Sequence, residues 1–399
     1  MISILGIILI LGLCFLLSKN RKNISFRTTI SALCVQALLA FFILKTNIGR
    51  DFFSFLGDRV IDLIRLADEG GKMVFGQKLY TSDVVFFFKM TSALVFISSL
   101  ISILYELRIL QPILKYSSIV FQKIIRVSAA EILINIGSAF VGMISSALLL
   151  KKDLHKLSNS QFFSIMTGGM STMSIALLAV YANNMGIPSK YLLAANIMGI
   201  PSGILISKML FPPDNKEEYV QALPENEKDE NPPNVISACL NGAQEGFKIA
   251  MSICAVIIGI VSIMALLNSI LGLGNLSLSK IFSFIFYPFA FLSGASLQDS
   301  ATIAGLFGTK IAINEFVAFS QLSNITNLCA SFSEKTLMLS TFLICGFANF
   351  GSVAMQISAF SEMLPERKLD FTKMGLFTLF GAILATLLSA CWANLFFSF

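Results

Sequence analysis

The chain has 399 residues, of which 55% are hydrophobic and only 13% are charged. Together with a mean hydropathy of +0.79, this composition excludes a soluble globular protein and predicts an all-α integral membrane protein. The net charge of +6 comes from basic residues dispersed between apolar segments, which predicts contact with membrane lipid and excludes a nucleic-acid-binding surface. Seven cysteines without CxxC spacing indicate packing residues, not a disulfide framework or a zinc site.

The N-terminal part, residues 1–128, is expected to supply scaffold helices. Membrane spans are predicted at about 2–17, 28–46 and 84–105. The stretch 51–83 has mixed charge, and its part 51–69 places aromatic and charged residues at helical spacing, so this part is expected to be an amphipathic helix on the membrane surface. The first span lacks the basic start of a signal peptide and is followed by a basic loop, which predicts a retained span with the N-terminus outside.

Residues 129–150 are apolar but have basic residues on both sides. Both flanks belong in the cytoplasm, so we predict a re-entrant hairpin that enters and leaves on that side. Two spans should follow, at about 161–185 and 190–210. The glycines and hydroxyl residues at 167–172 predict an unwound centre in the first of these spans.

The second half of the chain repeats this order of elements. An acidic, proline-bearing stretch at 211–234 is expected to be a cytoplasmic linker. Residues 235–294 should then contain a sixth span, at about 246–271, and an interfacial segment. The second repeat, 295–397, is expected to contain a hairpin at 295–325, a span at 336–360 interrupted between Gly346 and Gly351, and a whole span at 374–397.

These predictions give about eight transmembrane helices and two re-entrant helical hairpins, with both chain ends outside the inner (cytoplasmic) membrane. An odd number of crossings separates the hairpins, so they enter from opposite sides. This is the inverted-repeat transport domain of secondary transporters, whose site lies near the middle of the membrane. The sequence has no GxxxxGK[ST] phosphate loop, so transport would be driven by an ion gradient and not by ATP.

The residues most indicative of function are Glu315, Asn349 and Ser352. A charge at bilayer depth costs roughly 2.5–3.5 kcal/mol on insertion scales, so Glu315 is expected to face a cavity or a partner. Asn349 and Ser352 lie in a second apolar run that is broken by glycines. The alternative for Glu315 is a carboxylate at the end of a loop, in contact with water.

Around these residues the chain resembles the concentrative nucleoside transporter family. The resemblance covers roughly residues 110–397 and is strongest in GTKIAINEFVAF (308–319) and CGFANFGSVA (345–354). It implies a homotrimer with a central scaffold and a mobile transport domain. It also implies import of nucleosides together with sodium or protons.

The resemblance also assigns roles to individual residues. Glu315 matches the glutamate that accepts hydrogen bonds from ribose hydroxyls, and Asn349 and Ser352 match the polar pair that completes the ribose site. Phe347 matches an aromatic residue beside the sugar. Hydroxyl groups bound by a carboxylate and an amide in a dry pocket form strong, charge-assisted hydrogen bonds.

The first hairpin differs from the family pattern. The family has glycine, glutamine, threonine and glutamate where this chain has Gly142, Met143, Ile144 and Ser145. Two apolar side chains and a hydroxyl would therefore face the nucleobase. Such replacements relax discrimination or change the ligand, so a nucleoside, another hydroxylated solute and a loss of transport activity all stay open.

The coupling ion has two alternatives. The oxygens of a family sodium site would come from Ser138, Val141, Ile144, Ser171 and Thr172, although Ser138 replaces the family asparagine. The other alternative is a proton carried by Glu315, since a carboxylate in a dry pocket resists ionisation. No other cofactor is expected.

Two further charges have open interpretations. Lys310 either lies at the hairpin mouth with its amine in water or is an internal charge partner, and Glu131 either orients the first hairpin or lies at the cytoplasmic interface. A membrane enzyme would need paired acids or a metal-binding motif, and neither is visible. A scaffold protein would have no use for Glu315, Asn349 and Ser352. The sequence therefore predicts a transporter and not an enzyme.

Overall fold

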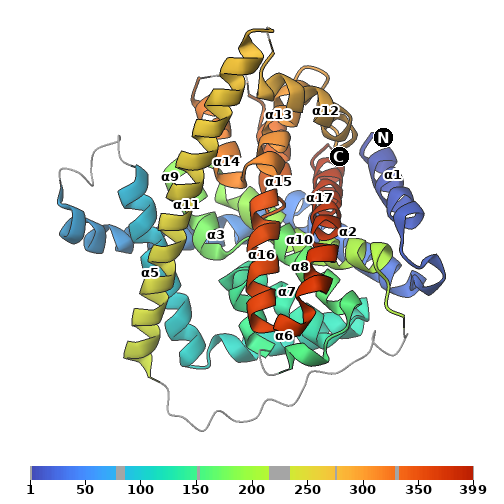
Figure 1. The fold of residues 1–399 in the computed structure, drawn as a ribbon, viewed down its shortest axis with the longest axis horizontal. Coiled ribbons are helices and arrows are strands. Elements are labelled where there is room, and N and C mark those ends of the chain that lie inside the picture. Colours follow the sequence, from blue (N-terminus) through green and yellow to red (C-terminus); the bar gives the residue numbers. More distant parts are fainter. Residues whose placement is uncertain are drawn as a thin grey trace.

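The computed structural model describes residues 2–77, 86–150, 153–214, 234–274, 276–328 and 332–398. All regular secondary structure in these ranges is helical (Figure 1). The expected all-α architecture is confirmed. Most of the predicted acidic linker, residues 215–233, lies outside the described ranges.

The N-terminal part forms a helix at each of the three predicted spans, and two amphipathic helices. They are α1 (Ile2–Leu17), α2 (Phe26–Lys45), α3 (Asn47–Phe75), α5 (Phe86–Glu106) and α6 (Leu110–Ile125). Ser25 and Thr46 accept hydrogen bonds from the first-turn N–H groups of α2 and α3, and so fix where these helices begin. Helix α3 buries Phe53 and Ile64 on one side, as the amphipathic pattern predicted.

The first repeat contains a hairpin, a broken helix and a whole helix. Its elements are α7 (Ala129–Val141), the 3-10 helix η2 (Ser145–Leu150), α8 (Asn159–Ser171), α9 (Ile175–Met185) and α10 (Ser189–Leu210). The hairpin turns at Gly142, whose φ of +103° is a conformation that favours glycine. The returning arm is a 3-10 helix and packs directly against α7.

The break in the first repeat lies later than the sequence predicted. Residues 167–171 are helical, and the chain unwinds only at residues 172–174. The glycines serve close packing: a Cβ on Gly168 would lie 1.7 Å from Asn135 Oδ1, and a Cβ on Gly203 would lie 2.7 Å from the Cα of Gly168. The unwound backbone is held by Asn196, whose Oδ1 accepts the Met173 N–H at 2.8 Å.

The second repeat has the same order of elements. It contains α13 (Ser300–Ala312) and α14 (Glu315–Leu328), the broken pair α15 (Glu334–Ile344) and α16 (Phe350–Met363), and the whole helix α17 (Lys368–Ser398). Before it come α11 (Val235–Gly272), which starts well before the expected residue 246, and α12 (Leu278–Leu292), in the predicted interfacial segment. The break between α15 and α16, residues 345–349, overlaps the predicted interruption between Gly346 and Gly351.

The whole helices α10 and α17 hold the two repeats together. Ser202 of α10 donates to the Ala385 carbonyl at 2.6 Å, and Ser389 of α17 donates to the Met198 carbonyl at 3.4 Å. Helices α1 and α2 pack on α10 and α17, whereas α5 packs along α11. The division of the chain into scaffold and transport parts stays a prediction.

Membrane-spanning character follows from length and apolarity. In the described part of the chain, five helical segments are long and apolar enough to cross a membrane: Phe26–Lys45, Phe87–Glu106, Asn159–Met185, Ser189–Leu210 and Pro365–Phe397. The segment Asn159–Met185 includes the break between α8 and α9. The protein is therefore a multi-pass membrane protein.

Candidate functional site

Glu315 is the first residue of α14, directly after the turn of the second hairpin. Asn314 caps this helix, since its Oδ1 accepts the Val317 N–H at 2.9 Å. The Glu315 side chain is only 6% exposed. A carboxylate in the first turn is stabilised by the positive end of the helix dipole, so the fold partly offsets the cost of burying this charge.

Asn349 connects this carboxylate to the break in the second repeat. Its Nδ2 donates to Glu315 Oε2 at 3.0 Å, while its Oδ1 accepts the Ser352 N–H at 2.8 Å and so caps α16. The cap decides which end of the amide faces Glu315. The structure thus brings Glu315, Asn349 and Ser352 together. Ser352 takes part through its backbone N–H, which binds the Asn349 side chain.

Tyr181 completes the surroundings of Glu315 and was missed by the sequence analysis. It lies on α9 and is fully buried, and its hydroxyl donates to Glu315 Oε1 at 3.3 Å. Its ring is 4.6 Å from the ring of Phe319, which fixes its position. Each carboxylate oxygen therefore has a side-chain donor and retains capacity to accept from a ligand.

Phe347 lies in the break itself and is buried. The backbone turns tightly here, with the Asn349 N–H donating to the Phe347 carbonyl at 2.8 Å. The neighbouring Gly346 has a φ of +101°, and a Cβ on it would lie 3.0 Å from the carbonyls of Met170 and Ser171. The break in the second repeat is thus packed against the C-terminal end of α8, which belongs to the first repeat.

The first hairpin reaches the same region with its tip. A Cβ on Gly169 would lie 3.1 Å from the Cβ of Met143 and 2.9 Å from Nε2 of Gln356, one turn beyond Ser352 on α16. Gly142 forms the turn, and the Ile144 carbonyl accepts the Ala147 N–H.

Ser145 has a different partner: its hydroxyl donates to Glu245 of α11 at 2.6 Å. Among the described residues, the tip residues 142–145 make no hydrogen bond to Glu315. The tip therefore contributes mainly apolar contacts to this region.

Oxygens of the predicted ion site meet where α8 ends. Thr172 Oγ1 lies 3.2 Å from Ser138 Oγ and 3.1 Å from the Gly168 carbonyl, and Ser171 donates to the Thr167 carbonyl at 2.7 Å. The last carbonyls of a helix have no intrahelical donors. Hydroxyls and carbonyls of this kind are hard oxygen ligands, so the donor set fits a small alkali cation. Val141 closes α7 beside this cluster.

Lys310 is fully buried, so its interpretation as a lysine reaching water is wrong. Its Nζ donates to the carbonyls of Leu343 at 3.1 Å and Cys345 at 3.4 Å, and lies 3.4 Å from Thr386 Oγ1. Lys310 thus joins α13 to the end of α15 and to α17.

Glu131 is also buried, and the interpretation as an interfacial carboxylate is wrong. Its Oε1 lies 2.5 Å from Nζ of Lys208 on α10, and both side chains are almost completely buried. The Ser128 N–H donates to Oε2 at 3.1 Å, and Lys208 also donates to Ser160 at 3.0 Å. The pair ties the base of the first hairpin to α10, consistent with an orienting role.

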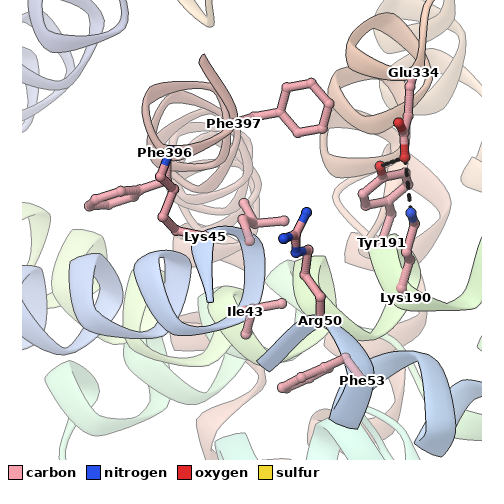
Figure 2. A pocket seen from close by; sticks show the side chains of 10 residues that line it. Ile43, Lys45, Arg50, Phe53, Lys190, Tyr191, Glu334, Phe396 and Phe397 are labelled. Carbon is pink, nitrogen blue, oxygen red and sulfur yellow. Dashed lines mark hydrogen bonds and ion pairs between the residues drawn. The ribbon is translucent and has the colours of Figure 1, made fainter. Parts of the chain in front are cut away.

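A separate cavity of about 260 Å³ lies where the C-terminal ends of α2 and α17 meet the starts of α3, α10 and α15 (Figure 2). Its polar groups include Lys45, Arg50 and a bonded cluster in which Glu334 accepts from Lys190 at 2.9 Å and from Tyr191 at 2.5 Å. None of the predicted site residues lines this cavity. It is therefore distinct from the Glu315 site.

Comparisons with known proteins agree with this architecture. Residues 5–78 match the family described as Na+ dependent nucleoside transporter N-terminus, and residues 191–394 match its C-terminus. An uncharacterized transporter of Haemophilus influenzae is 36% identical over 99% of this chain and 97% of its own length. The putative nucleoside permease NupX of Escherichia coli is 31% identical over 99% of this chain and 98% of its length.

Solved structures give the same result. CNTnw in an inward-facing substrate-bound state superposes with a TM-score of 0.92 at 30% identity, covering 99% of this chain and 98% of that one. The resemblance drawn from the sequence motifs and the expected inverted-repeat fold are thereby confirmed. The chain belongs to the concentrative, Na+-dependent nucleoside transporter family.

Proposed function

We propose that this protein imports nucleosides across the cytoplasmic membrane by symport with sodium. The observation that supports this most directly is the buried hydrogen bond between Asn349 and Glu315, which connects the second hairpin to the broken helix of the same repeat. Family membership and the nucleoside transport named for several relatives support the solute class.

Glu315 and Asn349 would bind the ribose. Vicinal hydroxyls are neutral donors, and a carboxylate that already has one protein donor on each oxygen can still accept one hydrogen bond from each of them. Such bonds are strong because the carboxylate is charged and shielded from water. Phe347 supplies an apolar surface beside the sugar, and Ser352 completes the polar wall.

The nucleobase would meet the first hairpin. Met143 and Ile144 offer no hydrogen bonds from their side chains, and Ser145 already donates to Glu245. A site with few polar contacts discriminates weakly between bases. We therefore expect purine and pyrimidine nucleosides to be carried at similar rates, with the ribose hydroxyls as the main determinant. A different hydroxylated solute is the second candidate, favoured by these apolar tip residues.

Sodium would bind at the cluster formed by Ser138, Ser171 and Thr172, together with the carbonyls of Val141 and Ile144. Two observations support this assignment: the hydroxyls of Ser138 and Thr172 lie 3.2 Å apart, and they lie at the C-terminal end of α8, whose last carbonyls have no intrahelical donors. A homotrimer in the inner membrane, with both chain ends outside, is proposed from the family and from the distribution of basic loops.

Uptake into proteoliposomes tests the proposal. Radiolabelled uridine, adenosine and inosine would be offered under a sodium gradient at equal pH, and under a pH gradient without sodium. We expect concentrative uptake of all three with sodium only, and weak competition by 2′,3′-dideoxy analogues. Uptake that follows the pH gradient alone would replace sodium by a proton on Glu315. A lack of uptake of all three nucleosides, with uptake of another polyhydroxylated solute, would change the solute class.

A further inference from the structure

Lys310 is a buried cation that the transport chemistry proposed above does not use. Its side chain is fully enclosed, and no described carboxylate lies within ion-pair distance of its amine; the Glu315 carboxylate acts on it electrostatically from farther away. Its three acceptors are the carbonyls of Leu343 and Cys345 and the hydroxyl of Thr386. An ammonium group has three donors and no acceptor, so these three oxygens match its bonding capacity.

The carbonyls that bind Lys310 belong to the C-terminal end of a half-helix. Helix α15 ends at Ile344, and Leu343 and Cys345 flank this residue. The last carbonyls of a helix are unpaired and carry the negative end of its dipole. In transporters with broken helices, such ends coordinate the coupling cations. Lys310 therefore occupies a position whose electrostatics suit a metal ion.

The first repeat has an equivalent place with a different occupant. There, α8 ends at Ser171, and the hairpin arm α7 presents Ser138 four residues before its turn at Gly142. In the second repeat, α13 presents Lys310 three residues before Ile313, the residue that directly follows that helix. One hairpin arm thus offers a hydroxyl to the end of its half-helix, and the other offers an ammonium group.

We infer that Lys310 is a tethered cation, which takes in the second repeat the place that a dissociable cation takes in the first. Its amine joins α13, the break at 345–349 and α17, so it sets the distance between the second hairpin and Asn349. Lys310 is thus a positioning residue for the bond between Asn349 and Glu315. The comparison with the first repeat rests on the proposed sodium site; the positioning role does not.

Removal of the side chain should create a site that a small cation can fill. In Lys310→Ala the three oxygens lose their donors and a space the length of the lysine stem opens beside them. Lys310→Met fills the space but supplies no donors. Lys373→Ala, on an exposed lysine of α17, is the matched control. The measurement is the melting temperature of the purified protein without solute, with methylammonium, ammonium or choline added.

We expect both Lys310 variants to melt below the wild type and to take up solute at least about tenfold more slowly, because buried carbonyls are left unpaired. Methylammonium and ammonium should raise the melting temperature of Lys310→Ala and restore part of its uptake. They should not do so for Lys310→Met, and choline, which is too large, should have no effect. Lys373→Ala should behave as the wild type.

Three results would overturn the inference: wild-type stability and uptake of Lys310→Met, no stabilisation of Lys310→Ala by methylammonium, or equal stabilisation of both variants. If Lys310→Ala does not accumulate as folded protein, cells grown with methylammonium provide the same test, and failure to restore folded protein counts against the inference. The melting temperature is measured without solute. A wrong solute class would therefore leave this result intact.

Discussion

Asn349 and Glu315 are 34 residues apart in the chain, yet the amide of one donates to the carboxylate of the other at 3.0 Å. The amide has no freedom to turn away, because its oxygen caps α16 through the Ser352 N–H. The break in the second repeat and the second hairpin therefore present their polar groups as one preorganised surface.

Replacing Glu315 with Gln should remove most uptake. An amide cannot accept two charge-assisted hydrogen bonds from ribose, and each such bond contributes about 1.5–3 kcal/mol, so the uptake rate should fall roughly ten- to a hundredfold or more. Glu362→Gln, an exposed residue of α16, is the control. Initial rates of uridine uptake measure the effect, and an unchanged rate in Glu315→Gln would falsify the assignment of the site.

Tyr181→Phe should have a smaller effect of the same kind. The ring keeps its packing against Phe319, but Glu315 loses the donor at Oε1. One hydrogen bond to a charged group changes the binding free energy by about 1.5–3 kcal/mol, so we expect KM for the solute to rise about tenfold or more. Tyr116→Phe, on the exposed face of α6, should leave KM unchanged. Equal KM values for both variants would argue against a role of Tyr181 in the site.

Ser138→Ala and Thr172→Val should alter the ion dependence of uptake and not the solute affinity at saturating ion. Each change removes one hydroxyl oxygen from the pair that lies 3.2 Å apart. The sodium concentration for half-maximal uptake should rise at least about tenfold for each variant, the effect of roughly 1.4 kcal/mol of binding free energy. Thr372→Ala on the exposed side of α17 is the control. A sodium response identical to that of the wild type would place the ion elsewhere.

The buried pair of Glu131 and Lys208 predicts a pattern of stability changes. Glu131→Gln or Lys208→Met alone leaves one buried charge without its partner, which costs about 3–5 kcal/mol. Changing both residues to Met removes both charges and should be much milder, because desolvation of the ion pair is also avoided. Thermal melting of the purified variants measures this. If the double variant lost as much stability as the two single variants together, the two residues would contribute independently and would not act as a pair.

The spans were predictable because hydropathy and length determine them. The second span and α10 were expected at 28–46 and 190–210 and are found at Phe26–Lys45 and Ser189–Leu210. The break in the first repeat was misplaced because glycine has two uses in a membrane helix. Gly168 lets α7 and α10 approach α8, whereas the unwinding occurs just after it, at residues 172–174.

Glu315 was identifiable because an acidic residue inside an apolar run is costly and therefore informative. Its partner Tyr181 was not, since it is 134 residues away and tyrosine is common in apolar helices. The role of Lys310 was hidden for another reason: its acceptors are mostly backbone carbonyls, which every residue has. Such acceptors can be identified only when the structure shows which helix end lies beside the lysine.

The reciprocal bonds of Ser202 and Ser389 across α10 and α17 have a mechanical consequence. Each helix is both donor and acceptor for the other, so a shift of one helix along the other would break both bonds. With the proposed sodium at the end of α8 and the proposed solute beside Glu315, both ligands would bind to the same pair of linked repeats. Coupling between the two ligands would then follow from the joint movement of the linked repeats, with no relay of side chains between the ligands.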